Sequence, residues 1–158
     1  MSITTERVTT RGFVACRVFR AVRTDINRFF ILYELEAPGV LDGEAYLARL
    51  NLPTPWSQHI MPRLGNFIRG GGSMIARAGR GEGATIAALR IERLPNDPGG
   101  LANAIVGCDG VVAVQIGATD QARTSVPTVE KGMRKSEGFC RIAGDRGPRR
   151  GGAARCLA

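Results

Sequence analysis

One segment, residues 28–69, restricts the possible folds of this chain more than any other. Residues 29–36 carry apolar side chains at every odd position, which is the period of a strand. Residues 43–51 and 54–68 instead place their apolar side chains at helical spacing. Pro38 and Gly39 separate the two patterns. The segment therefore predicts a strand followed by two helices, which places the chain in the α+β class.

A second strand is expected just before this segment. In residues 13–22 the even positions form one mostly apolar face, and residues 23–28 form a polar turn with Asp and Asn. Adjacent strands joined by a short turn predict an antiparallel hairpin. Further strands are expected at residues 73–78, 84–93 and 110–117, with a helix at 101–106 and a helical turn at 128–135 capped by Thr128.

Proline residues predict where the helix over residues 54–68 begins and where it breaks. Thr54 can cap the helix, and Pro55 fits its first position. Pro62 has no amide hydrogen to donate to the carbonyl of Gln58. We therefore expect the helix to kink or restart at Pro62.

Composition narrows the classes of function. The chain has 158 residues, enough for one domain or for one domain and part of a second. Half of its net charge of +8 lies in residues 141–158, which have no periodic pattern and predict disorder. Its four Cys form no Cys-x-x-Cys pair, and one His with scattered Cys does not supply the ligands of a metal site, so we expect no metal. No cofactor is predicted. The first residues do not resemble a signal peptide, and no apolar run reaches the ~20 residues of a membrane span, so we expect a cytoplasmic protein.

The rare side chains of residues 28–69 suggest a ligand pocket. Tyr33, Tyr46 and Trp56 would form apolar walls, and His59 and Arg63 would hold an anionic or carbonyl group. His59 is the only His, so a catalytic His would have to be this residue. A structural, hydrogen-bonding His is the more common case. No catalytic residue is predicted.

The string RFFILYELEAPGVLDGEAYLARLNLPTPW, residues 28–56, resembles uncharacterised bacterial proteins of the dimeric α/β-barrel superfamily. That superfamily includes EthD-like proteins and antibiotic-biosynthesis-type monooxygenases. The similarity spans residues 12–91 and resumes more weakly over 110–137, where SVPTVEKGMR resembles part of a second repeat. The resemblance implies a ferredoxin-like antiparallel sheet with helices on one face. It also implies a chain shortened at its start, with TTERV as the end of the first helix, and altered at its end by a shifted reading frame.

These observations predict four segments: an N-terminal arm at residues 1–11, a ferredoxin-like core at 12–93, a partial second repeat at 94–139 and a disordered tail at 140–158. The expected function is to bind or transform a small aromatic or carbonyl-containing molecule as a homo-oligomer. A variant of this hypothesis is that the chain in this form has lost its activity. Two alternatives stay open. One is a protein-interaction module that uses an exposed sheet edge, and the other is a weak nucleic-acid binder that uses the Arg-rich tail.

Overall fold

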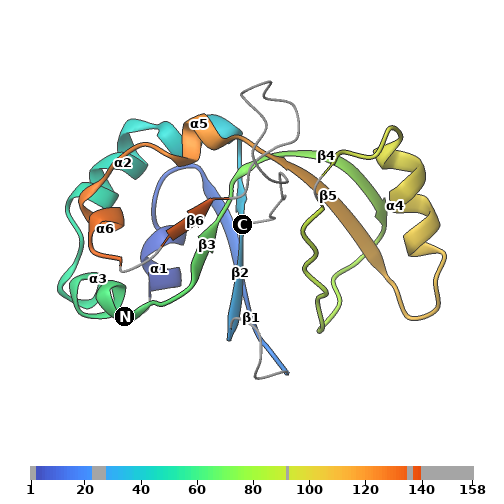
Figure 1. Ribbon diagram of the computed structural model, residues 1–158, viewed down its shortest axis with the longest axis horizontal. Helices are drawn as coiled ribbons and strands as arrows, with labels where there is room; N and C mark the ends of the chain where they lie inside the picture. Colours follow the sequence, from blue (N-terminus) through green and yellow to red (C-terminus); the bar gives the residue numbers. More distant parts are fainter. Residues whose placement is uncertain (1–2, 23–27, 92, 135–136, 140–158) are drawn as a thin grey trace. The chain divides into compact units, whose positions relative to one another are not determined.

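The computed structural model describes residues 3–22, 28–91, 93–134 and 137–139 (Figure 1). In them, helices pack on small strand pairs, which confirms the α+β class. Contacts divide these residues into unit 1, residues 3–69 and 122–139, and unit 2, residues 70–121. The four-segment division expected from the sequence stays a prediction, and the tail at 140–158 lies outside the described residues.

The predicted hairpin is present in unit 1. β1 (Phe13–Arg20) pairs antiparallel with β2 (Phe29–Leu35). The pairing shifts by one residue at Val14, which is therefore a bulged residue of β1. The bulge brings Phe13 to the face that carries Cys16, whereas strict alternation predicted Val14 there. Val14 is instead 62% exposed.

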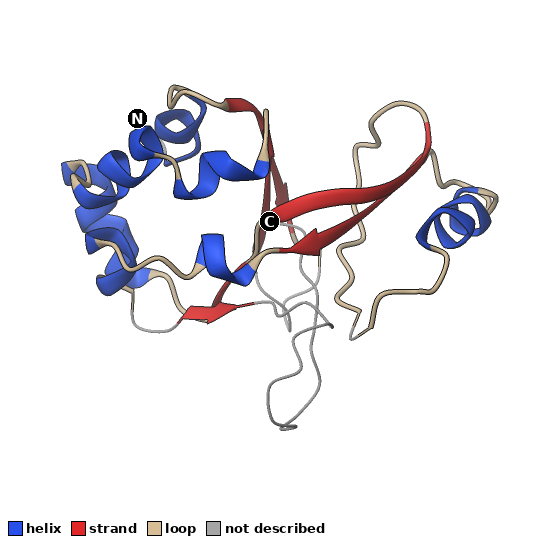
Figure 2. Cartoon of the chain, turned by 90° about the horizontal axis from the view of Figure 1, so that it is seen from above, coloured by secondary structure: helices blue, strands red, loops and turns tan. Residues whose placement is uncertain are grey.

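Helices cover only one end of this hairpin. The helices α1 (Ile3–Val8), α2 (Glu44–Asn51) and α3 (Pro55–Ile60) lie on one side of it (Figures 1 and 2). The core forms there, from Phe13, Leu35, Leu41, Tyr46 and Leu50. At the other end Val18, Val22 and Phe29 are exposed. The core of unit 1 therefore lies at the end of the hairpin opposite the start of β2.

Local signals in residues 54–63 are confirmed. The Thr54 hydroxyl accepts a hydrogen bond from the Ser57 amide at 3.2 Å, which caps α3. α3 ends at Ile60, and the chain restarts as a 3₁₀ helix, η2 (Met61–Arg63), as Pro62 predicted.

The expected continuation of this helix to residue 68 is wrong. Asn66 has a φ of 51°, a left-handed conformation that ends a helix. The chain then forms β3 (Phe67–Arg69), which pairs in parallel with β6 (Glu137–Phe139). The remaining elements of unit 1 are the 3₁₀ helix η1 (Pro38–Asp42), α5 (Gln121–Thr124) and α6 (Val129–Gly132), the last capped by Thr128 as predicted.

A buried polar network connects α1 to two other helices. The Arg7 guanidinium donates to both carboxylate oxygens of Glu130, and both residues are at most 4% exposed. Arg134 donates to the same carboxylate at 3.1 Å. Glu6 accepts from the Thr54 hydroxyl at 2.6 Å and from the Ser57 hydroxyl at 3.0 Å. Residues 3–11, which belong to the segment predicted to be an arm, thus include a helix with two buried charges.

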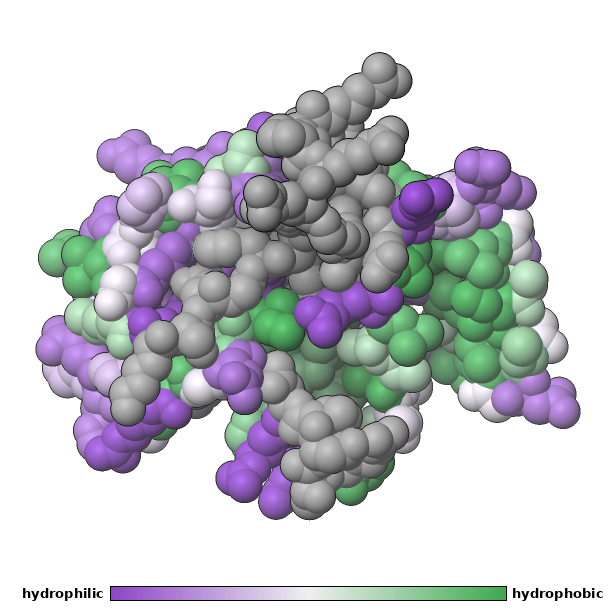
Figure 3. All heavy atoms as spheres, viewed as in Figure 1, coloured by the Kyte–Doolittle hydropathy of each residue, from purple (hydrophilic) through white to green (hydrophobic). Residues whose placement is uncertain are grey.

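Unit 2 has its own small core. β4 (Gly72–Gly79) pairs antiparallel with β5 (Ala113–Thr119), and α4 (Pro98–Val106) packs on both strands. The buried residues are Ala78, Ala102 and Ile116. Figure 3 shows hydrophobic side chains over α4 and β5 on one surface. The strand predicted at residues 84–93 is not formed in its described residues, because β4 takes β5 as its partner.

Removal of the Glu130 carboxylate tests the network. Glu130→Ala would leave Arg7 buried without its counter-charge, and we expect it to lower the free energy of unfolding by about 3–5 kcal/mol. Asp42→Ala is the control, because it breaks the exposed Asp42–Arg123 pair and should change stability by about 0–1 kcal/mol. Urea unfolding measures both values. Equal losses in the two variants would contradict a structural role for the buried pair.

Candidate functional site

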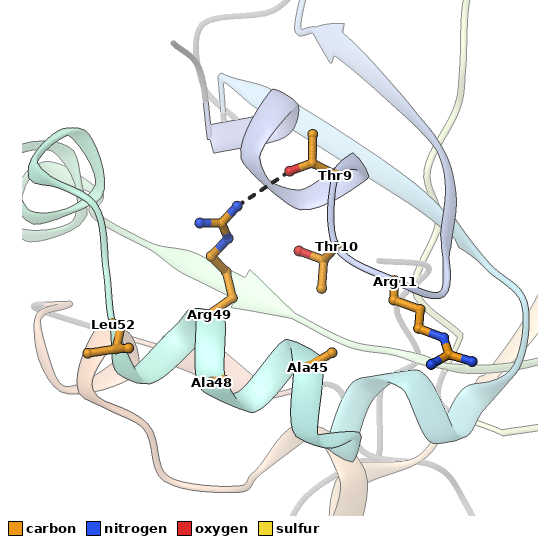
Figure 4. A pocket seen from close by; sticks show the side chains of 7 residues that line it. All are labelled: Thr9, Thr10, Arg11, Ala45, Ala48, Arg49 and Leu52. Atoms are coloured by element: carbon orange, nitrogen blue, oxygen red, sulfur yellow. Dashed lines mark hydrogen bonds between the residues drawn. The ribbon is translucent and has the colours of Figure 1, made fainter.

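A hollow of about 380 Å³ lies between the end of α1 and the outer face of α2 (Figure 4). Its lining residues are Thr9, Thr10, Arg11, Ala45, Ala48, Arg49 and Leu52. Two Arg offer hydrogen-bond donors and two Thr offer hydroxyl oxygens, while small and apolar side chains from α2 form the rest of the wall. No acidic residue lines this hollow, so it favours an anion.

Helical spacing explains how α2 contributes to this hollow. Ala45, Ala48, Arg49 and Leu52 follow the i, i+3, i+4, i+7 spacing, which places them on one face. The opposite face carries the buried Tyr46 and Leu50. Leu52 is 78% exposed, so an apolar side chain is available to a ligand.

The end of α1 supplies the other wall. The Thr9 and Thr10 hydroxyls donate to the Glu6 carbonyl at 2.9 and 3.3 Å, which closes the helix end. Figure 4 shows the Arg49 side chain reaching toward Thr9, and Arg49 Nη2 lies 3.4 Å from Thr9 Oγ1. The Arg11 side chain points away from that pair.

A second hollow, of about 300 Å³, continues from the first. The two share Arg11 and Ala45 in their walls, and the second adds Glu36 and Glu44. One of its lining residues, Gly12, can only be glycine. Its φ of 91° is strained for other residues, and a Cβ at this position would lie only 2.5 Å from the Val40 side chain. We call the two hollows together the α2 groove.

The interior next to the groove holds two of the predicted ligand-binding residues. The Tyr46 hydroxyl accepts from Arg69 at 3.2 Å, and the Phe13 ring lies 5.0 Å from Tyr46 and 5.5 Å from Tyr33. Burial raises the pKa of Tyr33, and its hydroxyl donates to the Cys16 thiol. Tyr33 therefore serves as a protonated core residue at neutral pH.

The other three predicted residues lie at the surface. Trp56 is 44% exposed on α3, with its ring 6.3 Å from that of His59, and Arg63 is exposed on η2. Within the described part of the chain, no ring contact or hydrogen bond joins these three to Tyr33 or Tyr46. Of the five predicted residues, Tyr46 alone lines the α2 groove. The proposed pocket of five residues stays a prediction.

Apart from Tyr46, the residues of the α2 groove were missed by sequence reasoning. Ala45 and Ala48 carry no chemical signature, and Thr9 to Arg11 belong to a segment expected to be an arm. The helical spacing of the α2 residues could have predicted that they share one face of the helix. Nothing in the sequence indicates that α1 ends against that face.

The described residues hold neither a metal-binding cluster nor a membrane-spanning helix. They contain no group of three or more His, Cys, Asp or Glu side chains that could hold a metal ion. No helix among them is long and apolar enough to cross a membrane.

Comparison with known proteins gives no relative. No family model matches the chain, and no curated protein or solved structure is significantly similar to it.

The reactivity of Cys16 tests the interior described above. Burial raises the pKa of Cys16, although the Tyr33 hydroxyl opposes the shift, so little thiolate is present at pH 7. We expect iodoacetamide to modify Cys16 more slowly than the exposed Cys108. Peptide mapping by mass spectrometry measures both rates, which should become similar in urea. Faster modification of Cys16 in the folded protein would contradict its placement.

Proposed function

We propose that this chain binds a small molecule with an anionic group in the α2 groove. The single observation that carries the proposal is the first hollow, where the Arg49 guanidinium accompanies an apolar wall and no acidic residue. A carboxylate can accept charge-assisted hydrogen bonds from a guanidinium. An aromatic or aliphatic part of the ligand would lie on Leu52 and on the small side chains of α2.

The volume of the first hollow supports a ligand of modest size. About 380 Å³ lies at the lower end of the range of small-molecule sites. The hollow is also bordered by helices on both sides, α1 and α2, whose relative position depends on buried contacts of α1. The proposal agrees with the small aromatic or carbonyl-containing ligand that the sequence suggested, but assigns it to other residues.

Substitution of Arg49 tests the proposed function. We expect Arg49→Gln to weaken the binding of 3-phenylpropionate three- to tenfold, about 0.7–1.4 kcal/mol, because one charge-assisted hydrogen bond is lost. Arg63→Gln removes the same charge from η2, outside the groove, and should leave binding unchanged. Isothermal titration calorimetry measures the dissociation constants. Equal effects of the two substitutions would indicate non-specific attraction and overturn the proposal.

A second candidate function is self-association through the hairpin. Val18 and Phe29 lie on the same face of β1 and β2, beyond the end that the helices cover, and are 51% and 56% exposed. Apolar side chains and strand edges that remain open favour pairing with another strand. We propose that a second copy of the chain occupies this end, as expected for a member of the dimeric α/β-barrel superfamily.

The order of elements supports a ferredoxin-like arrangement as part of the same proposal. With α3 and the two 3₁₀ helices set aside as insertions, α1, β1, β2, α2 and β3 come in the order helix, strand, strand, helix, strand along the chain. A ferredoxin-like unit has this order after its first strand. The helices α1 and α2 also lie on one side of the β1–β2 hairpin (Figure 2).

Light scattering after size-exclusion chromatography tests the second candidate. We expect the unmodified chain to have the mass of a dimer and Val18→Lys to have that of a monomer, because a charge would be buried in the interface. Leu89→Lys, at a residue 72% exposed in unit 2, is the control and should stay dimeric. A monomeric unmodified chain would remove the second candidate without affecting the α2 groove.

A further inference from the structure

The α2 groove differs in charge between its two ends. The first hollow contains Arg49 and no acidic residue, whereas the second contains Glu36 and Glu44. Arg11 lines both hollows, and Figure 4 shows its side chain directed away from Arg49. With Arg11 counted in the second hollow, the formal charge is +1 in the first hollow and −1 in the second.

We propose that the ligand of the α2 groove is a zwitterion, a short peptide whose carboxylate lies near Arg49 and whose ammonium group lies near Glu36 and Glu44. This inference rests on the proposed function of the first hollow and names the class of its ligand. A carboxylate accepts from a guanidinium, and an ammonium group donates three hydrogen bonds that acidic side chains can accept.

The charged groups of the groove are available to a ligand. Arg11, Glu36 and Glu44 are exposed, and none of them forms an ion pair with another residue that the structure describes. Arg49 makes a single hydrogen bond of 3.4 Å to Thr9 among these residues. A ligand would therefore displace no strong pair on entering the groove.

The helix dipole of α2 does not reverse this assignment. The first turn of a helix carries about +0.5 elementary charge, which disfavours a cation near Glu44. With Arg11 counted, the formal charge of −1 at this end is about twice that partial charge and of opposite sign, so Glu36 and Glu44 still dominate. Arg49 similarly outweighs the partial negative charge at the other end of α2.

The spacing fits a peptide of two or three residues. Glu44 and Arg49 are five positions apart on α2, which separates them by about 7.5 Å along the helix axis at a rise of 1.5 Å per residue. An extended chain spans about 3.3–3.6 Å per residue, so the termini of a di- or tripeptide lie about 7–10 Å apart. The small side chains of Ala45 and Ala48 leave room for a peptide backbone along the helix.

Three probes separate the two charges of such a ligand: the dipeptide Ala-Phe, its N-acetyl form, which has only the carboxylate, and its amide, which has only the ammonium group. We expect calorimetry to give at least about tenfold tighter binding for the dipeptide than for either blocked form. Glu36→Gln combined with Glu44→Gln should reduce dipeptide binding to the level of the N-acetyl form, which itself should be unaffected. Glu34→Gln, outside the groove, is the control and should change nothing.

The outcomes distinguish this inference from the proposed function. Equal binding of the dipeptide and its N-acetyl form would overturn the zwitterion and keep an anionic ligand. Binding of the amide as tight as that of the dipeptide would overturn both, because the carboxylate would then have no role. Binding of none of the three probes would also overturn both. Circular dichroism of each variant confirms that the exposed substitutions leave the fold intact.

Discussion

Unit 1 depends on the buried ion pair between Arg7 and Glu130, which joins residues 123 positions apart in the sequence. A buried pair of this kind adds little stability compared with a well-packed apolar pair, because both charges lose their hydration. Loss of one partner is costly, however, since the remaining charge stays buried. The pair therefore acts mainly by excluding arrangements in which α1 lies elsewhere.

The position of α1 in turn determines the α2 groove. Arg7 and Glu6 are fixed by α6 and α3, and the chain continues directly into Thr9, Thr10 and Arg11, which line the first hollow. α2 has a similar double role, with Tyr46 and Leu50 in the core and its outer face in the groove. The core and the proposed site thus share the same two helices, and a change in the network should alter the groove as well as the stability.

Features that depend on neighbouring residues could be predicted from the sequence. The hairpin, the Thr54 cap and the restart at Pro62 each follow from a few consecutive residues. The network and the groove could not, because Glu6 and Ser57 are 51 positions apart and Thr9 and Arg49 are 40. The predicted strand at residues 84–93 failed for the same reason. Its alternating pattern was correct as a local signal, but a strand needs a partner, and β4 pairs with β5.

The prediction of the site gave most weight to rare residues such as Trp56 and His59, while the groove consists of common ones. Charges on α2 alone would be weak support for a site, because Glu44 in the first turn and Arg49 in the last also complement the helix dipole. That explanation does not extend to Glu36, which follows β2, or to Arg11, which follows α1. Charged residues from three separate parts of the chain line the α2 groove, and helix stability does not require them there. Recognition of a ligand with two opposite charges accounts for all four.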